Sequence, residues 1–191
     1  MDLIYIIDVS LSMIDEIDEV RNQLNQSLLS LREKSANENI DTFVTVLSFS
    51  EEVNVLRLYE PLDRISPLEA EELRVQSNTA LYDAMLFAID MANQRSKEIA
   101  KNQLGGISII LFTDGEENQS VTTRQQMKKK LKKATKRKGW NIDLASSYDA
   151  SLVDFIGLGL KESQTFSFEQ GEETKAVKHM EMRVREYFKK L

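Results

Sequence analysis

Three oxygen-bearing side chains stand at alternating positions directly after the apolar run 3–7: Asp8, Ser10 and Ser12. This run is rich in β-branched and aromatic residues and is typical of a buried strand, so its end delivers one carboxylate and two hydroxyls into a single loop. Hard oxygen donors without His or Cys favour Mg²⁺, Mn²⁺ or Ca²⁺ over zinc or copper. Ser and Asp after a strand also commonly cap the next helix. The trio alone therefore leaves two interpretations open, a metal site and a helix cap.

A second apolar run, 107–112, also ends in an acidic loop, 113–118, which contains Asp114. In doubly wound sheets, ligands bind at the carboxyl ends of the strands, near the point where the strand order reverses. If the two strands are neighbours, Asp8 and Asp114 come together there. Between them in the sequence, Thr79 offers a hydroxyl at the start of an expected helix. These are the parts of a divalent-cation site assembled from three loops.

Strands and helices alternate along the whole chain. Short apolar or alternating runs indicate strands, and apolar residues recurring at spacings of three and four indicate helices. We expect strands over 3–7, 42–49, 53–59, 107–112, 140–145 and 165–168, and helices over 13–35, 80–100, 121–138, 149–156 and 172–190. The short link between 42–49 and 53–59 makes that pair a hairpin. The predicted fold is a three-layer, doubly wound (Rossmann-like) α/β fold, in which a mostly parallel sheet with one antiparallel edge strand carries helices on both faces.

Two expected helices have clear apolar stripes. The stripe of the helix over 13–35 consists of Ile14, Ile17, Val20, Leu24, Leu28 and Leu31. The stripe of the helix over 80–100 consists of Leu81, Met85, Phe87, Ala88 and Met91. Such stripes are the faces that amphipathic helices pack against a core.

Length and composition describe an ordinary globular chain. The 191 residues suffice for one well-cored domain, and without an internal repeat or linker we expect a single domain over 1–191. The 31 acidic and 25 basic residues give a net charge of −6, which argues against a nucleic-acid partner. There is no Cys, which excludes disulfides and zinc-thiolate sites. Because neither a signal peptide nor a membrane-spanning run is evident, we expect a cytoplasmic protein with no membrane partner.

The three loop blocks resemble the von Willebrand factor type A (vWA) domain with its metal-ion-dependent adhesion site. An apolar strand ends in Asp-x-Ser-x-Ser-Met at 8–13, Thr-Ala-Leu-Tyr-Asp-Ala follows at 79–84, and a second apolar strand ends in Thr-Asp-Gly-Glu-Glu-Asn at 113–118. Their order and spacing are those of the family. Later blocks, at 139–140, 148–150 and 158–160, resemble small stand-alone bacterial members, some of which accompany tellurium-resistance or stress genes. The resemblance therefore covers most of the chain.

The resemblance implies that five side chains surround the cation, some directly and some through water: Asp8, Ser10, Ser12, Thr79 and Asp114. Two carboxylates roughly cancel the charge of the ion, while three hydroxyls are weak, neutral donors. The metal therefore stays electrophilic toward a further anion. Mg²⁺ prefers six oxygens in octahedral geometry, so an open or water-filled position is expected. In the family, this position accepts a Glu or Asp carboxylate from a partner protein.

Two positions depart from the family pattern. The family often has Gly where this chain has Leu11, and again where it has Asn78. Glycine permits backbone angles that Leu avoids and that Asn tolerates better. Leu11 therefore raises the question whether the loop keeps its geometry, although no oxygen donor is lost.

Three acids near the predicted site have alternative interpretations. Asp83 lies one turn beyond Thr79, and either accepts a hydrogen bond that orients the metal loops or is a plain first-turn acid favoured by the helix dipole. Glu116 and Glu117 are close enough to Asp114 to reach a cation, but we expect them to be solvated loop acids and leave them out of the metal set.

The run 128–138 contains eight Lys and Arg residues, which is the sharpest charge feature of the chain. It predicts either an anion-binding patch or a solvated helix face, and the absence of interleaved aromatic residues favours the solvated face. His179, the only histidine, lies far in sequence from the metal loops, and we expect it at the surface. Trp140, at a strand start, is expected in the core.

The leading functional hypothesis is a non-enzymatic, metal-dependent protein-interaction module with Mg²⁺ as its ion, Mn²⁺ or Ca²⁺ being possible, and a protein partner that presents an acidic residue. A competing class is a Mg²⁺-dependent phosphatase-like hydrolase with Asp8 as nucleophile. Such enzymes usually place a second Asp two residues on, where this chain has Ser10. A third class is a metal-independent scaffold that binds its partner through sheet edges or the basic helix.

Overall fold

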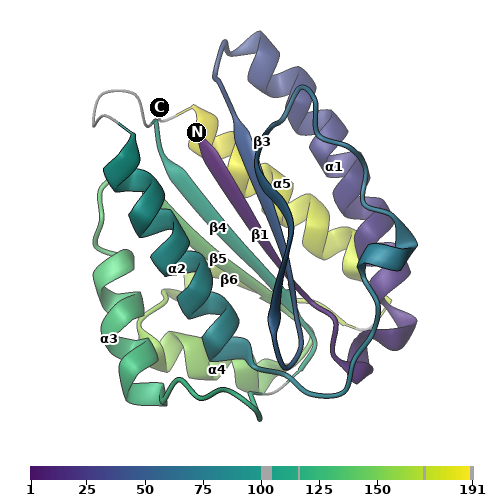
Figure 1. Ribbon diagram of the computed structural model, residues 1–191, viewed down its shortest axis with the longest axis vertical. Helices are drawn as coiled ribbons and strands as arrows, with labels where there is room; N and C mark the ends of the chain where they lie inside the picture. Colours follow the sequence, from purple (N-terminus) through teal and green to yellow (C-terminus); the bar gives the residue numbers. More distant parts are fainter. Residues whose placement is uncertain (100–104, 116, 170, 190–191) are drawn as a thin grey trace.

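The computed structural model describes residues 1–99, 105–115, 117–169 and 171–189 and contains a six-stranded sheet (Figure 1). The strands are β1 (Asp2–Asp8), β2 (Phe43–Phe49), β3 (Val53–Pro61), β4 (Ile107–Thr113), β5 (Trp140–Ser146) and β6 (Thr165–Ser167). Their order is β3-β2-β1-β4-β5-β6, and every neighbouring pair is parallel except β2 with β3. The predicted fold class, including the antiparallel edge strand, is confirmed.

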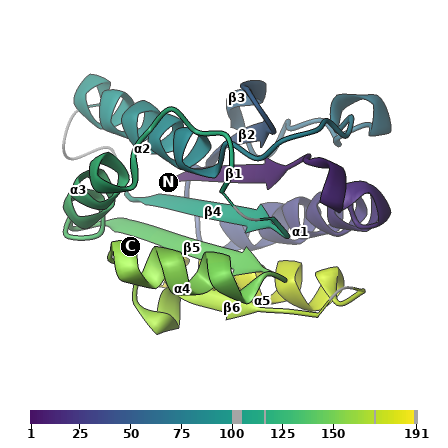
Figure 2. The same ribbon diagram turned by 90° about the horizontal axis from the view of Figure 1, so that it is seen from below.

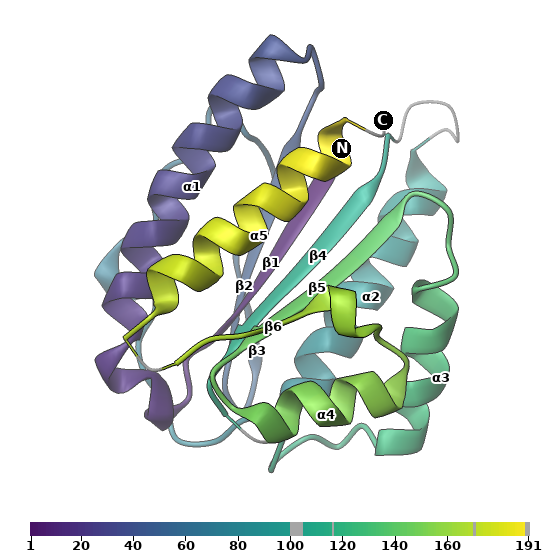
Figure 3. The same cartoon turned by 180° about the vertical axis from the view of Figure 1, so that it is seen from behind.

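Helices cover both faces of the sheet (Figures 2 and 3). They are α1 (Ile17–Asn37), α2 (Leu81–Glu98), α3 (Arg124–Ala134), α4 (Asp149–Leu158) and α5 (Glu173–Phe188). One apolar cluster joins the sheet to α1 and α5, and a second joins the opposite face to α2, α3 and α4. Within the described residues, no helix combines the length and the apolar character needed to cross a membrane.

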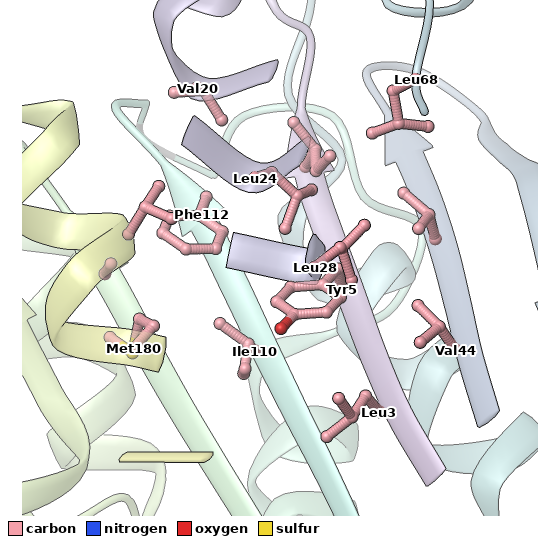
Figure 4. Close-up of a cluster of buried hydrophobic side chains, with 14 of the residues drawn as sticks. Leu3, Tyr5, Val20, Leu24, Leu28, Val44, Leu68, Ile110, Phe112 and Met180 are labelled. Carbon is pink, nitrogen blue, oxygen red and sulfur yellow. The ribbon is translucent and has the colours of Figure 1, made fainter. Parts of the chain in front are cut away.

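The central strand β1 shows why the chain forms three layers. All seven of its residues are buried, and alternate side chains enter opposite clusters. Leu3 and Tyr5 lie with Leu24 and Leu28 of α1 (Figure 4), whereas Ile4 faces the other helix layer. A strand buried on both faces needs an unbroken apolar sequence, which is what the run 3–7 provides.

The start of α1 differs from the prediction. Residues Leu11–Asp15 form a 3₁₀ turn, and the α-helix begins only at Ile17. With about three residues per turn, this segment buries Met13 and leaves Ile14 60% exposed, so the assignment of Ile14 to the apolar face is wrong. Phe87, assigned to the stripe of the second helix, is also exposed.

Other boundaries shift by a few residues. The third helix is shorter than 121–138 at both ends: a capping box of Thr123 and Gln126 starts α3 at Arg124, and the helix ends at Ala134. The strand β3 extends to Pro61 at the sheet edge, where a missing N–H is tolerated. The expected helix ends at 100 and 190 lie outside the described residues.

Candidate metal centre

Asp8 is the last residue of β1, and its side chain is fully buried. Its Oδ1 accepts the backbone N–H of Ser10 at 2.8 Å, and its Oδ2 accepts the hydroxyl of Thr113 at the end of β4. Burial raises the pKa of Asp8 to about 6, because these hydrogen bonds only partly offset desolvation and Asp114 adds a further, smaller upward effect. The fold thus holds a carboxylate in a place that disfavours its charge.

The loops after β1 and β4 meet through a chain of polar side chains. The hydroxyl oxygens of Ser10 and Ser12 lie 3.1 Å apart, and the Ser12 hydroxyl donates to Asp114 Oδ1 at 2.8 Å. Ser10 is buried, Asp114 is partly exposed, and burial raises the pKa of Asp114 as well. Because β1 and β4 are parallel neighbours, the two acidic loops lie together, as predicted.

Thr79 approaches the same place from the segment before α2. A Cβ atom added to Gly115 would lie 3.3 Å from Thr79 Oγ1 and 3.5 Å from Asp8 Oδ2. The glycine therefore leaves a small space that any side chain would fill, bordered by a buried hydroxyl and a buried carboxylate oxygen. The structure brings all five predicted site residues to one corner of the sheet.

The position of Thr79 depends on residues that sequence reasoning missed. The Asn118 side chain accepts the Thr79 backbone N–H at 3.0 Å, and the Asn118 backbone N–H donates to the Thr79 carbonyl at 3.2 Å. The next residue, Ala80, donates its N–H to the Ser50 carbonyl at 2.6 Å. Asn118 lies in the loop 113–118 that the sequence had singled out, whereas Ser50, in the β2–β3 turn, carried no signal.

Glu117 connects the loop after β4 to the first turn of α2. The helix has no side-chain cap of its own, and Glu117 Oε2 accepts the Tyr82 backbone N–H at 2.8 Å. The same carboxylate accepts the backbone N–H groups of Gln119 and Ser120, at 3.0 and 2.7 Å. The expectation that Glu117 is a solvated loop acid is therefore wrong, because its carboxylate accepts hydrogen bonds from three backbone N–H groups. Glu116 lies outside the described residues.

Asp83 has a similar bridging role. Its carboxylate accepts the backbone N–H groups of Val121 and Thr122, both at 2.9 Å. Asp83 does lie in the first turn of α2, as one alternative held, but its carboxylate also fixes the segment leading into α3, which neither alternative included.

The two departures from the family pattern leave the backbone unstrained. Neither Leu11 nor Asn78 has a positive φ. The Asn78 amide donates to Glu51 at 2.7 Å, and the Leu11 side chain is 58% exposed. At these two positions the backbone therefore does not adopt the positive-φ conformation that favours glycine.

The donor set fits a hard divalent cation. Two carboxylates and three hydroxyls supply only oxygen, as Mg²⁺ or Ca²⁺ requires. Within the described residues there is no cluster of three or more His, Cys, Asp or Glu side chains that could hold a metal, so a site rich in nitrogen or sulfur ligands is absent there. The space beside Gly115 is compatible with a small ion among these oxygens.

The single histidine and the single tryptophan of the chain do not belong to the candidate site. His179 on α5 is half-buried and stacks on Phe166 of β6, with ring centroids 4.1 Å apart, so it is only partly a surface residue. Trp140 is partly buried against the core, and the Arg137 guanidinium lies 4.8 Å from its ring centroid.

No family model and no curated protein matches the chain. Several solved structures, however, have a similar fold. The PilB minor pilin of Streptococcus sanguinis has a TM-score of 0.69 at 13% identity, over 96% of this chain and 61% of PilB. Proximal thread matrix protein 1 of the mussel byssus, with a zinc-occupied MIDAS motif, has a TM-score of 0.60 at 15% identity, over 96% and 45%. A von Willebrand factor type A protein from Catenulispora acidiphila has a TM-score of 0.58 at 15% identity, over 94% and 41%.

These similarities define the class of the fold. A doubly wound α/β sheet with its polar corner at the carboxyl ends of β1 and β4 is the architecture found here, and it is the vWA-like fold. The chain spans less than two thirds of the length of each of these three structures.

Proposed function

We propose that the chain is a divalent-metal-dependent protein-interaction module. One cation, Mg²⁺ by preference, is held by oxygens of five residues, and a carboxylate from a partner protein completes its coordination. The five residues are Asp8, Ser10, Ser12, Thr79 and Asp114.

The observation that carries the proposal is the pair of carboxylates at the corner of the sheet. Asp8 and Asp114 both have a raised pKa, and neither forms an ion pair with a described Lys, Arg or His. Desolvated carboxylates without a cationic neighbour are costly. A divalent cation among them would remove that cost. The zinc in the MIDAS motif of the mussel protein supports a divalent ion in this fold.

The neutral hydroxyls favour binding of a further anion. Ser10, Ser12 and Thr79 would offer oxygens without charge, so the two carboxylates would do no more than balance the ion. The cation would therefore keep its attraction for an external carboxylate, which a third acidic ligand would weaken.

Apolar side chains beside the loop support a protein as the source of that carboxylate. Leu11 and Ile14 are 58% and 60% exposed, and both belong to the turn that contains Ser12. Exposed apolar residues next to a polar centre are typical of protein-binding surfaces. A partner segment with an acidic residue flanked by apolar side chains would match both features.

The environment of Asp8 supports binding rather than nucleophilic catalysis. A nucleophile must be reachable by its substrate, but Asp8 is fully buried and both of its oxygens accept hydrogen bonds. The position two residues on, where a hydrolase of this type carries its acid, is Ser10. Turnover of a phosphate ester that requires Mg²⁺ and is lost in Asp8→Asn would contradict the proposal.

Calorimetric titration of the metal-stripped protein with Mg²⁺ and Mn²⁺ tests the cation. We expect one site in the wild type and none in Asp8→Ala. Asp15→Ala is the matched control, because Asp15 is an exposed acid of the adjacent turn, and it should bind like the wild type. Unchanged affinity in Asp8→Ala would sink the proposal.

Partner capture tests the interaction. Wild type and Asp8→Ala are compared as baits in extract of the native organism, with Mg²⁺ and with EDTA. A partner held only by the wild type in Mg²⁺ supports the proposal, whereas capture that survives EDTA favours a metal-independent scaffold.

A further inference from the structure

A groove of about 870 Å³ lies between α2 and α3. The two helices run side by side on one face of the sheet (Figure 1). Residues of α2 from Leu86 to Lys97 line one wall, and at 1.5 Å per residue this wall is about 16 Å long. A groove of that length accommodates about five residues of extended chain.

The opposite wall is strongly basic. It includes Lys129, Lys130, Lys133 and Arg137. Lys130 pairs with Asp90 across the groove at 2.9 Å, while Lys129 and Lys133 form no ion pair with a described residue. These two like charges stand four residues apart on α3, a spacing that slightly destabilises a helix. On a chain with a net charge of −6, the groove concentrates positive charge that the fold leaves unbalanced.

The rest of the groove lining is polar or aliphatic. Asn93 belongs to it, and the side-chain Oδ1 of Asn93 is buried without a hydrogen-bond partner among the described residues. Leu86, which is partly buried, contributes apolar surface. A suitable occupant therefore brings negative charge for the lysines and little bulk.

We propose that this groove binds an extended acidic segment of a partner protein. Glu and Asp side chains supply the charge, and about five extended residues match the length of the groove. The proposal goes beyond the metal-dependent function, because binding here needs no cation. The sequence suggested that the basic run 128–138 forms a solvated helix face. In this proposal, part of that run is instead a recognition surface.

Two other polyanions fit the groove less well. Single-stranded nucleic acids bind through aromatic side chains that stack on bases, and none of the described lining residues is aromatic. A flat membrane surface would contact lysines on a raised face of the protein, whereas these lysines line a groove.

Fluorescence anisotropy of a labelled octaglutamate peptide, measured in EDTA at low salt, tests the proposal. We expect wild-type binding that weakens with added NaCl and about a tenfold loss of affinity in the Lys129→Glu/Lys133→Glu variant. The control Lys136→Glu/Lys138→Glu makes the same charge change at exposed positions outside the groove, and should lose less than about twofold.

Three results would overturn the proposal: no binding to the wild type, equal losses in the two double variants, or tighter binding of oligo-dT or phosphatidylserine vesicles than of the peptide. Circular dichroism of each variant checks the fold. Because EDTA is present throughout, failure here leaves the metal site untested, and an Asp8→Ala protein should bind the peptide like the wild type.

Discussion

Asp8 combines a structural cost with a proposed function. A carboxylate at this buried strand end loses hydration that two hydrogen bonds only partly replace. Proteins keep such groups where a ligand stabilises the charge. In the metal-free protein, the cost should be measurable as a stability difference that depends on pH.

Asp8→Asn should stabilise the metal-free protein at neutral pH. Since the folded pKa is about 6 and the ordinary value is 3.8, the folded state binds more protons than the unfolded state between these values. The destabilisation by ionised Asp8, about 3 kcal/mol, is present above pH 6 and fades as the pH falls toward 4. Urea unfolding of both proteins in EDTA from pH 4 to 8 measures this. A difference that does not change with pH would contradict it.

Gly115→Ala should weaken metal binding without preventing folding. The new methyl group would lie 3.3 Å from Thr79 Oγ1 and 3.5 Å from Asp8 Oδ2, and would occupy the space proposed for the ion. We expect about a tenfold lower Mg²⁺ affinity, in line with the 1–3 kcal/mol of an overpacked site. Gly157→Ala, whose methyl group meets only the end of the Arg124 side chain, is the control. Equal affinities in the two variants would count against the site.

Residue types and spacing were enough to predict that the five proposed donors lie together, because each follows a strand or precedes a helix that the sequence indicates. Thr113 was missed as a partner of Asp8, since a hydroxyl at a strand end is uninformative until the register of β1 and β4 is known. Ser50 was missed because its contribution is a backbone carbonyl, which any residue could supply.

At the scale of elements, the loop after β4 organises the start of α2. Glu117 caps that helix, and Asn118 fixes Thr79, so the segment before α2 and the loop after β4 form one unit. A change in the loop should therefore affect both stability and metal binding.

Glu117→Ala should lower the free energy of unfolding by about 2 kcal/mol, since three backbone N–H groups lose a charged acceptor. Mg²⁺ affinity should fall as well, because the loop that carries Asn118, which hydrogen-bonds Thr79, loses its connection to α2. Denaturant unfolding and calorimetry measure the two effects. Glu52→Ala, at an exposed turn, should change neither, and a Glu117→Ala protein as stable as that control would be inconsistent with the capping role.

Element types were predictable and element ends less so. The apolar runs of β1 and β4 and the stripes of α1 and α2 are strong signals. The 3₁₀ turn before α1 was not predicted, because Ile14 continues the helical spacing and only the tertiary position of Met13 decides which side chain is buried.

At the scale of the molecule, two parallel neighbouring strands bring together loops that are more than a hundred residues apart in sequence. Asp8 and Asp114 meet because β1 and β4 are neighbours, an order that the acidic strand ends themselves suggested. The groove between α2 and α3 could not be predicted, since it depends on how the two helices pack on the sheet.

Mg²⁺ should stabilise the folded chain as a whole. An ion bound only by the folded state adds about 2.7 kcal/mol at a hundred times its Kd, which raises Tm by several degrees for a chain of this size. Scanning calorimetry with Mg²⁺ and with EDTA measures the shift. Asp114→Ala should show none, and an equal shift in that variant would place the ion elsewhere.

A crystal structure of the protein grown with Mn²⁺ would show directly whether one divalent cation is held by five oxygens at this corner. We expect one strong anomalous peak between Asp8, Ser10, Ser12, Thr79 and Asp114, and no such peak in crystals of Asp8→Ala. An anomalous map without a peak there, or with the same peak in Asp8→Ala, would show that these oxygens do not hold the cation.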